Sequence, residues 1–217
     1  MNRGRLLATG RDADVYAYGA GRVLRRYRDG SDARPEAEVM RHVAAHGYPV
    51  PHVHGAAGPD LIMERLDGPT MWAAVQGGEL AAEPAATMLA SLQDRLHRIP
   101  GWSSAKTGAR VQHLDLHPLN VMLLPSGPVV IDWRNARDGE PQLDVAMSAL
   151  ILAQVAVRDA EGANEARAML PAFVRAARAD PLRGLAEALQ MRRRDANLTR
   201  DEVDLLAHAA ALVRAST

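Results

Sequence analysis

The segment 113-HLDLHPLNVML-123 concentrates side chains that can bind metal ions or transfer protons. His113, Asp115 and His117 alternate along it, so an extended strand would place them on one face, and zinc accepts ligands of these types. Pro118 follows directly and interrupts a regular strand, and no further histidine or acidic cluster nearby completes a tetrahedral set. A zinc site is therefore one open interpretation of the segment.

Two other interpretations compete with a metal site. The segment can be a solvated turn, in which Asp115 caps an element and Asn120 accepts a left-handed conformation. It can also serve phosphoryl transfer, which needs a carboxylate to orient the acceptor hydroxyl and oxygen ligands to hold Mg²⁺ against nucleotide phosphates. The pattern His113-x-Asp115-x-x-x-x-Asn120, a short hairpin and then Asp132 offers a base, a neutral oxygen ligand and an anionic one. An antiparallel hairpin would bring Asn120 and Asp132 to the same end, and such a pair suits Mg²⁺.

The stretch HLDLHPLNVML…VVIDWRNARDGEPQLDVA resembles the catalytic core of the aminoglycoside phosphotransferase-like kinases, which are relatives of the protein kinases. Its more distinctive half is Ile131-Asp132-Trp133 followed by Ala136, Gly139, Pro141 and Asp144, which differs from the Asp-Phe-Gly of protein kinases. The resemblance is specific over about 85–150 and fainter over 1–70.

This resemblance implies roles for individual residues. Asp115 would be the catalytic base, and His113 would belong to the catalytic loop as the residue that positions it. Asn120 and Asp132 would be the Mg²⁺ ligands. Asp144 would brace the lobe and would not touch substrate.

The N-terminal part is expected to hold the nucleotide. Alignment of 22-RVLR-25 with the family's V-A-I-K places Val23 beside adenine and Arg25 at the position of the phosphate-binding lysine. Its partner carboxylate would be Glu36, with Glu38 as the alternative. Arginine keeps the positive charge, but its planar guanidinium is bulkier than an ammonium group, so the exchange is not conservative.

Two further segments complete the expected nucleotide site. The loop 9-TGRDADVY-16 lacks the full G-x-G-x-x-G, so contacts to phosphate would depend on a few backbone N–H groups near Gly10 to Ala13. The segment 61-LIMERLDG-68 resembles the family's hinge, where Met63 would line the adenine pocket and the backbone of Glu64 to Leu66 would bind adenine. The cofactors implied are ATP, with GTP as an alternative, and Mg²⁺.

The pattern of apolar residues and turn signals predicts the elements that position these groups. Ser31 or Asp32 is expected to cap a helix that has Pro35 in its first turn and ends at Gly47. Pro49 and Pro51 then impose an extended passage. The other expected elements are strands at 4–10, 13–19, 22–28 and 60–66, a hairpin at 121–125 and 128–132, and helices at 82–99, 141–157, 163–179, 181–194 and 199–215.

These elements predict an α+β, bilobal, protein-kinase-like fold. A small antiparallel-sheet lobe would span residues 1–66, and a mostly helical lobe would span residues 67–217. The basic run 192-RRR-194 interrupts one helix and is expected to be a solvated face, with binding of an anionic substrate as a minor alternative. Lys106 is expected to be a solvated loop cation.

Composition limits the remaining function classes. The formal net charge is zero and the chain has no cysteine, so a broad nucleic-acid footprint, a thiolate nucleophile and a zinc–sulfur site are not expected. No apolar run reaches the roughly 20 residues that span a bilayer, and no signal-peptide pattern is visible. We therefore expect a cytoplasmic protein that does not bind membranes; its oligomeric state is not readable from the sequence.

The expected activity is transfer of a phosphoryl group to a hydroxyl of a small molecule. Scattered acidic residues alongside many arginines in the C-terminal part do not indicate a polycationic aminoglycoside as the acceptor. Two alternatives stay open: a nucleotide-binding pseudokinase without turnover, and a kinase that acts on proteins.

Overall fold

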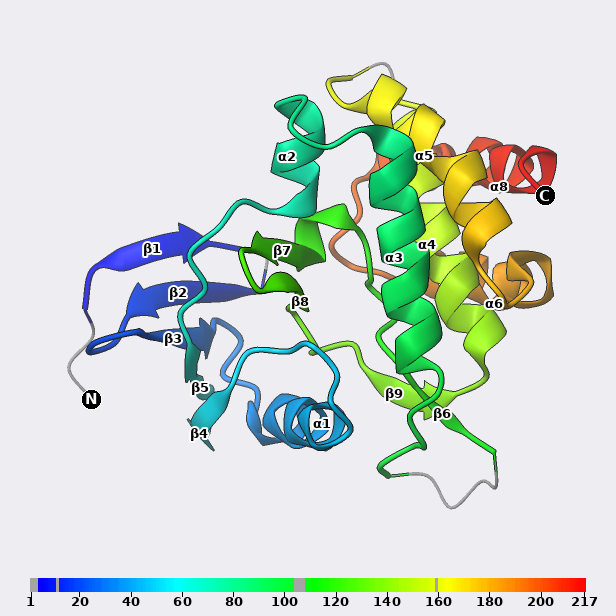
Figure 1. The fold of residues 1–217 in the computed structure, drawn as a ribbon. Coiled ribbons are helices and arrows are strands. Elements are labelled where there is room, and N and C mark those ends of the chain that lie inside the picture. The colour runs from blue at the N-terminus through cyan, green and yellow to red at the C-terminus, as the bar shows by residue number, and fades with distance from the viewer. Residues whose placement is uncertain (1–3, 11, 104–107, 159) are drawn as a thin grey trace.

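The computed structural model describes residues 4–10, 12–103, 108–158 and 160–217. Lys106 lies outside these ranges. The fold is α+β, with an antiparallel sheet in the N-terminal part and a helical C-terminal part, which confirms the predicted class (Figure 1).

A five-stranded antiparallel sheet forms the N-terminal part, in the order β1-β2-β3-β5-β4. Strand β4 was not predicted; it follows the expected extended passage and is irregular, with a register shift between Val53 and Gly55. Register places Val23 opposite Met63 and Arg25 opposite Val15, so all four side chains share one face of the sheet. The strands are β1 (Leu6–Thr9), β2 (Ala13–Ala17), β3 (Arg22–Tyr27), β4 (Val53–Ala57) and β5 (Asp60–Glu64).

Helix α1 (Arg34–Ala45) packs beside this sheet and carries Glu36 in its first turn. The predicted cap was wrong, because the N-cap is Ala33, whose side chain cannot accept a hydrogen bond. Asp32 instead accepts the N–H of Arg34 at 3.0 Å from just outside the helix. Gly47 follows the helix with a φ of 73°, the left-handed conformation that glycine adopts at helix ends.

The C-terminal part consists of helices packed around α4 (Pro141–Ala156). This helix is apolar around most of its circumference, and α5, α6 and α8 pack against it, which explains why it is buried. The predicted helix at 199–215 is wrong as a single element, because it divides into α7 and α8 at Leu205. The other helices are α2 (Met71–Gln76), α3 (Ala82–Leu96), α5 (Ala163–Ala176), α6 (Pro181–Arg193), α7 (Arg200–Asp204) and α8 (Leu206–Ala215).

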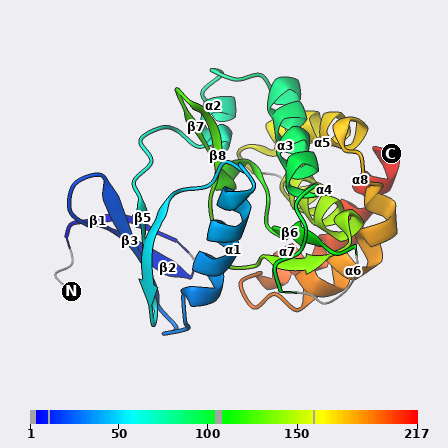
Figure 2. The same ribbon diagram turned by 60° about the horizontal axis from the view of Figure 1, so that its bottom comes forward.

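Two small strand pairs are separate from the five-stranded sheet and lie on the side of it where the C-terminal helices are (Figure 2). The predicted hairpin is confirmed as β7 (Val121–Leu124) and β8 (Gly127–Val130). The pair β6 (Arg110–Gln112) and β9 (Arg137–Gly139) was not predicted.

One continuous cluster of buried apolar side chains runs through both parts of the chain. Tyr48, just after α1, packs edge-on against Trp133, which follows the hairpin, with ring centroids 5.6 Å apart. The lobe boundary between residues 66 and 67 stays a prediction. No helix among the described residues is long and apolar enough to cross a membrane, and the cytoplasmic location likewise stays a prediction.

Candidate active site

The loop before the hairpin turns sharply at Leu114, whose φ of 62° is unusual for a residue other than glycine. The N–H of Leu114 donates to Oδ1 of Asp144 at 2.6 Å, and the other carboxylate oxygen of Asp144 lies 2.8 Å from Nε2 of His97. Asp144 comes from the first turn of α4 and is fully buried. It therefore braces the loop from behind, as expected.

The turn at Leu114 also sends the neighbouring side chains in different directions. His113 is fully buried; its Nε2–H donates to the carbonyl of Ile131 at 3.0 Å, and its Nδ1 accepts the N–H of Asp115 at 3.3 Å. Burial lowers the pKa of His113, so the ring is neutral, as these hydrogen bonds require. His113 thus connects the loop to the strand end before Asp132, and its burial prevents direct contact with a substrate.

Asp115 and His117 point away from His113, toward the cleft, so the alternating face proposed for zinc does not form. Nδ2 of Asn120 donates to the carbonyl of Asp115 at 2.9 Å and lies 3.3 Å from its Oδ2. His117 Nε2 lies 3.2 Å from the same Nδ2 and 3.5 Å from Oδ1 of Asp115. Within the described ranges, no three acidic or histidine side chains gather as a metal-binding group.

The hairpin brings Asn120 and Asp132 to the same end, because Val121 pairs with Val130 and the N–H of Ile131 donates to the carbonyl of Asn120 at 3.0 Å. Asp132 has a φ of 65°, so the two left-handed residues other than glycine in the described chain, Leu114 and Asp132, both lie at this site. Such strain persists only where surrounding contacts fix it, and it is concentrated at functional sites.

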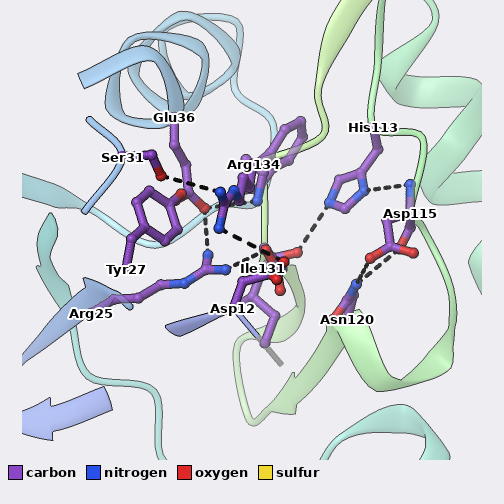
Figure 3. A network of polar contacts seen from close by, with 12 residues as sticks. Asp12, Arg25, Tyr27, Ser31, Glu36, His113, Asp115, Asn120, Ile131 and Arg134 are labelled. Carbon is purple, nitrogen blue, oxygen red and sulfur yellow. Dashed lines mark hydrogen bonds and ion pairs between the residues drawn. The ribbon is translucent and has the colours of Figure 1, made fainter. Parts of the chain in front are cut away.

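Arg25 connects the sheet to this hairpin end (Figure 3). Its Nη1 donates to Oε1 of Glu36 at 2.6 Å, and its Nη2 donates to Oδ1 of Asp132 at 2.5 Å. Oε1 of Glu36 also accepts the N–H of Trp133 at 2.9 Å, while its other oxygen accepts the hydroxyl of Tyr27. Glu36 is therefore the partner of Arg25, and the alternative, Glu38, is exposed.

The charges around Arg25 keep it protonated. Burial would lower its pKa, but the carboxylates of Glu36 and Asp132 raise it above the usual value. Burial and then the charge of Asp132 raise the pKa of Asp115 to about 7, while the charge of Arg192 acts in the opposite direction. The two aspartates are thus close enough to influence each other, and Asp115 titrates near neutrality.

A cleft of about 1190 Å³ lies between the sheet and the helices, and it collects the predicted residues. Glu36 and His113 are the exceptions, because both are buried behind its walls. The predicted residues that line the cleft are Gly10, Val23, Arg25, Met63, Glu64, Leu66, Asp115, Asn120 and Asp132.

The backbone groups expected to bind nucleotide differ in availability. The N–H of Gly10 donates to the carbonyl of Ala13 at 2.9 Å, so a phosphate contact in this loop would need another amide. In the hinge, the N–H groups of Glu64 and Arg65 donate to protein carbonyls. Among the described residues, no backbone carbonyl accepts the N–H of Leu66, so within the expected hinge this N–H is the one placed to donate to a ligand.

Sequence reasoning missed several residues at the site. Arg134 lies with its guanidinium carbon 4.4 Å from the ring centroid of Tyr27 and donates to Asp29 at 2.6 Å, which ties the segment after Asp132 to the sheet. Arg192, expected on a solvated face with binding of an anionic substrate as the minor alternative, lines the cleft. The direction of each side chain depends on how distant elements pack, and the local sequence does not show it.

Comparison with known families relates the chain to phosphotransferases. A family model described as the phosphotransferase enzyme family matches residues 3–110 and 105–185. The comparison with curated proteins gave no match.

Solved structures share the fold at low sequence identity. The ADP-bound aminoglycoside phosphotransferase APH(2'')-Ib is 15% identical, with a TM-score of 0.60 over 98% of this chain and 94% of that one. Aminoglycoside phosphotransferase APH(4)-Ia is 17% identical, with a TM-score of 0.59 over 98% and 93%. Amicoumacin kinase hAmiN, in complex with AMP-PNP, Ca²⁺ and Ami, is 13% identical, with a TM-score of 0.57 over 99% and 89%.

Proposed function

The chain belongs to the phosphotransferase enzyme family, and from this premise we propose that it transfers the γ-phosphoryl group of ATP to a hydroxyl group of a small molecule. It is a phosphotransferase with an alcohol group as acceptor; the donor, the metal and the residue roles are the proposal. The observation that carries it is the convergence of Asp115, Asn120, Asp132 and Arg25 on one cleft. Phosphoryl transfer depends mainly on positioning and on neutralisation of charge, and these four residues supply groups for both.

The nucleotide would bind along the face of the sheet that carries Val23 and Met63. These two side chains are paired in register and offer an apolar surface for a base, while the N–H of Leu66 is available to donate to it. Arg25, two residues along the same strand, would then reach the phosphates. The nucleotide complexes of APH(2'')-Ib and hAmiN support a nucleotide site in this fold, and GTP is the alternative donor to test.

Asn120 and Asp132 have the donor atoms that Mg²⁺ prefers. Nδ2 of Asn120 is engaged with the carbonyl of Asp115, which leaves its carbonyl oxygen for a cation, and Asp132 contributes a carboxylate that is 39% exposed. Mg²⁺ bound there would supply positive charge to the phosphates of the nucleotide.

Asp115 would hold the acceptor hydroxyl and receive its proton. As the acceptor oxygen bonds to the γ-phosphorus, the bond from that phosphorus to the bridging oxygen breaks, and its electron pair leaves with ADP. The Asp115 carboxylate is fixed for this task by the amide of Asn120 and by the backbone link to His113.

The test compares Asp115→Asn, Asp132→Asn and the exposed control Asp201→Asn. ATP and GTP consumption is measured with Mg²⁺ and a panel of hydroxyl compounds, and nucleotide affinity is measured by calorimetry. We expect Asp115→Asn to lower turnover about 10²–10⁴-fold with nearly unchanged nucleotide affinity, as for loss of a general base. Asp132→Asn should also weaken Mg²⁺-dependent nucleotide binding.

Unchanged turnover in Asp115→Asn would refute the assignment of the base. Nucleotide binding without consumption in the presence of any acceptor would identify a pseudokinase. Labelling of proteins in a lysate, with none of the small molecules labelled, would identify a protein-directed kinase.

A further inference from the structure

The cleft wall beyond Asp115 carries a guanidinium that is held in place. Arg192 lies in the last turn of α6, and its side chain is only 15% exposed. Its Nε donates to Oε1 of Gln154 on α4 at 2.9 Å, and its Nη1 donates to Oδ2 of Asp195 at 2.9 Å. Gln154 is itself buried, so this guanidinium is anchored by the core and not only by the surface.

The next two arginines serve as an internal comparison. Arg193 and Arg194 are both exposed, and Arg193 does not line the cleft. The expectation of a solvated face is thus confirmed for Arg193 and wrong for Arg192. The helix rotates each successive side chain by about 100°, so only part of the basic run can face the cleft.

Further arginines lie on this wall. Arg158 donates to Glu202 at 3.2 Å, and Arg137 donates to Glu187 at 3.1 Å, so acids accompany some of these arginines. Among the described residues that line the cleft from position 137 onward, four are arginines and two are acids. The arginines are Arg137, Arg158, Arg192 and Arg194, and the acids are Asp195 and Glu202.

An apolar strip borders these arginines. Met147, Ile151 and Val155 of α4 line the cleft at helical spacing, and Met191 and Leu205 lie with them. A ligand on this wall would therefore contact both hydrocarbon and guanidinium groups. A cationic group placed next to Arg192 would instead meet a like charge, which disfavours its binding at that point of the wall.

We infer that the acceptor is a small hydroxyl compound that carries an anionic group, a carboxylate or a phosphate, and that Arg192 binds this group while Asp115 faces the hydroxyl. The inference rests on the proposed function and adds the acceptor class to it. A planar guanidinium whose position is fixed by Gln154 and Asp195 is well suited to bind a carboxylate or phosphate, because little side-chain freedom is lost on binding.

The inference is tested by the binding of small probe molecules, measured separately from turnover. The probes are glycerate, glycerol 3-phosphate, glycerol and ethanolamine, each titrated by calorimetry into the 217-residue protein loaded with Mg²⁺ and AMP-PNP. We expect at least one anionic probe to bind at least about tenfold more tightly than glycerol and ethanolamine. Glycerate and glycerol 3-phosphate distinguish the carboxylate from the phosphate.

Three variants localise the effect. Arg192→Gln should abolish the preference for anions, Arg192→Lys should retain part of it, and Arg193→Gln should behave as wild type. None of them should change the affinity for the nucleotide by more than about twofold. Thermal unfolding of each variant establishes that it is folded, and Arg192→Lys keeps the test valid if Arg192→Gln does not fold.

Several results would overturn the inference. Glycerol or ethanolamine could bind as tightly as the anions or more tightly, or neither anion could bind detectably. The preference for anions could also survive in Arg192→Gln. Finally, a loss of nucleotide affinity in that variant would place Arg192 at the donor phosphates. None of these results bears on whether Asp115→Asn loses turnover. Failure of the acceptor class is thus distinguishable from failure of the proposed function.

Discussion

Arg25 Nη2 lies 2.5 Å from Oδ1 of Asp132, so a strand of the N-terminal sheet contacts the residue that follows the C-terminal hairpin. The same guanidinium contacts Glu36 at 2.6 Å, and its side chain is only 9% exposed. One cation therefore serves two carboxylates, one buried and one in the cleft. A metal ion held by Asp132 would have to share this carboxylate with Arg25 or displace it.

Removal of this cation should expose the cost of burying Glu36. We expect Arg25→Met to lower the free energy of unfolding by about 3–5 kcal/mol, because a buried carboxylate then lacks its counterion. The double variant Arg25→Met/Glu36→Gln should recover a large part of that loss. Urea denaturation at pH 7 measures all three free energies.

The matched control is Arg34→Met, which removes the exposed pair with Asp32. This change should alter stability by no more than about 1 kcal/mol. Equal losses in Arg25→Met and Arg34→Met would show that Glu36 does not depend on Arg25.

Asp144 should be the main polar brace of the catalytic loop. Burial would raise its pKa, but the hydrogen bond and charge of His97, together with the N–H of Leu114, lower it below the usual value. The stability that its ionised form contributes is therefore present above the unfolded pKa of about 3.9 and is lost as pH falls through the lower folded pKa. We expect Asp144→Ala to cost about 3–5 kcal/mol at pH 7.

Urea denaturation at pH 7, 5 and 3 tests this expectation, with the exposed Asp67→Asn as control. The loss in Asp144→Ala should shrink at the lowest pH, whereas the control should stay within about 0.5 kcal/mol of wild type throughout. A loss that does not vary with pH would mean that packing, and not charge, determines the effect of Asp144.

The effect of Asp115 on the free energy of unfolding should depend on pH in the opposite direction to that of Asp144. The folded pKa of Asp115, about 7, lies above the unfolded value, so ionisation destabilises the folded state increasingly between the two pKa values. Asp115→Asn should therefore stabilise the protein at pH 8 by about 1–3 kcal/mol and have little effect near pH 3. The side chain is 26% exposed, so the gain should stay well below the full value of the shift.

The same urea series measures this gain. Stability that falls at pH 8 in Asp115→Asn would contradict the expectation and would show that the carboxylate is favourably placed in the absence of substrate. The contrast between Asp144 and Asp115 separates a structural aspartate from one whose ionisation destabilises the fold.

The parts of the site that were predictable depend on local sequence. The loop that carries Asp115 and Asn120, the hairpin and Asp132 are close along the chain, so a turn signal and two apolar runs were enough to bring the proposed ligands together. The α+β class followed from strands that precede helices. The pairing of Arg25 with Glu36, by contrast, followed from the resemblance of 22-RVLR-25 to the family's V-A-I-K strand, and the contact between the two side chains agrees with it.

What sequence reasoning missed depends on packing between distant segments. Strand β4 and the pair β6 and β9 are short and form by pairing with partners elsewhere, so propensity alone did not reveal them. The alternation of His113, Asp115 and His117 was misleading because Leu114 is held left-handed by Asp144, thirty positions away. The direction of Arg192 depends on the rotation of α6 against α4, which the basic run does not encode.

Gly184 should control the rotation of α6 against α4. A Cβ at this position of α6 would lie 2.4 Å from the carbonyl oxygen of Gln142 and 2.6 Å from Cα of Leu143, both backbone atoms at the start of α4. Alanine usually stabilises a helix by about 0.5–1 kcal/mol relative to glycine. We expect Gly184→Ala instead to destabilise the protein by about 1–3 kcal/mol, because α6 must move away from α4.

Thermal unfolding and anion binding together test this expectation. Gly55→Ala is the control, since a Cβ there meets no atom within 4 Å. Because Arg192 is held to Gln154 across the same pair of helices, Gly184→Ala should also weaken the preference for anionic probes, while Gly55→Ala should leave it intact. Stabilisation by Gly184→Ala would mean that α6 has room to shift, and the anchoring of Arg192 by α4 would then lose its structural basis.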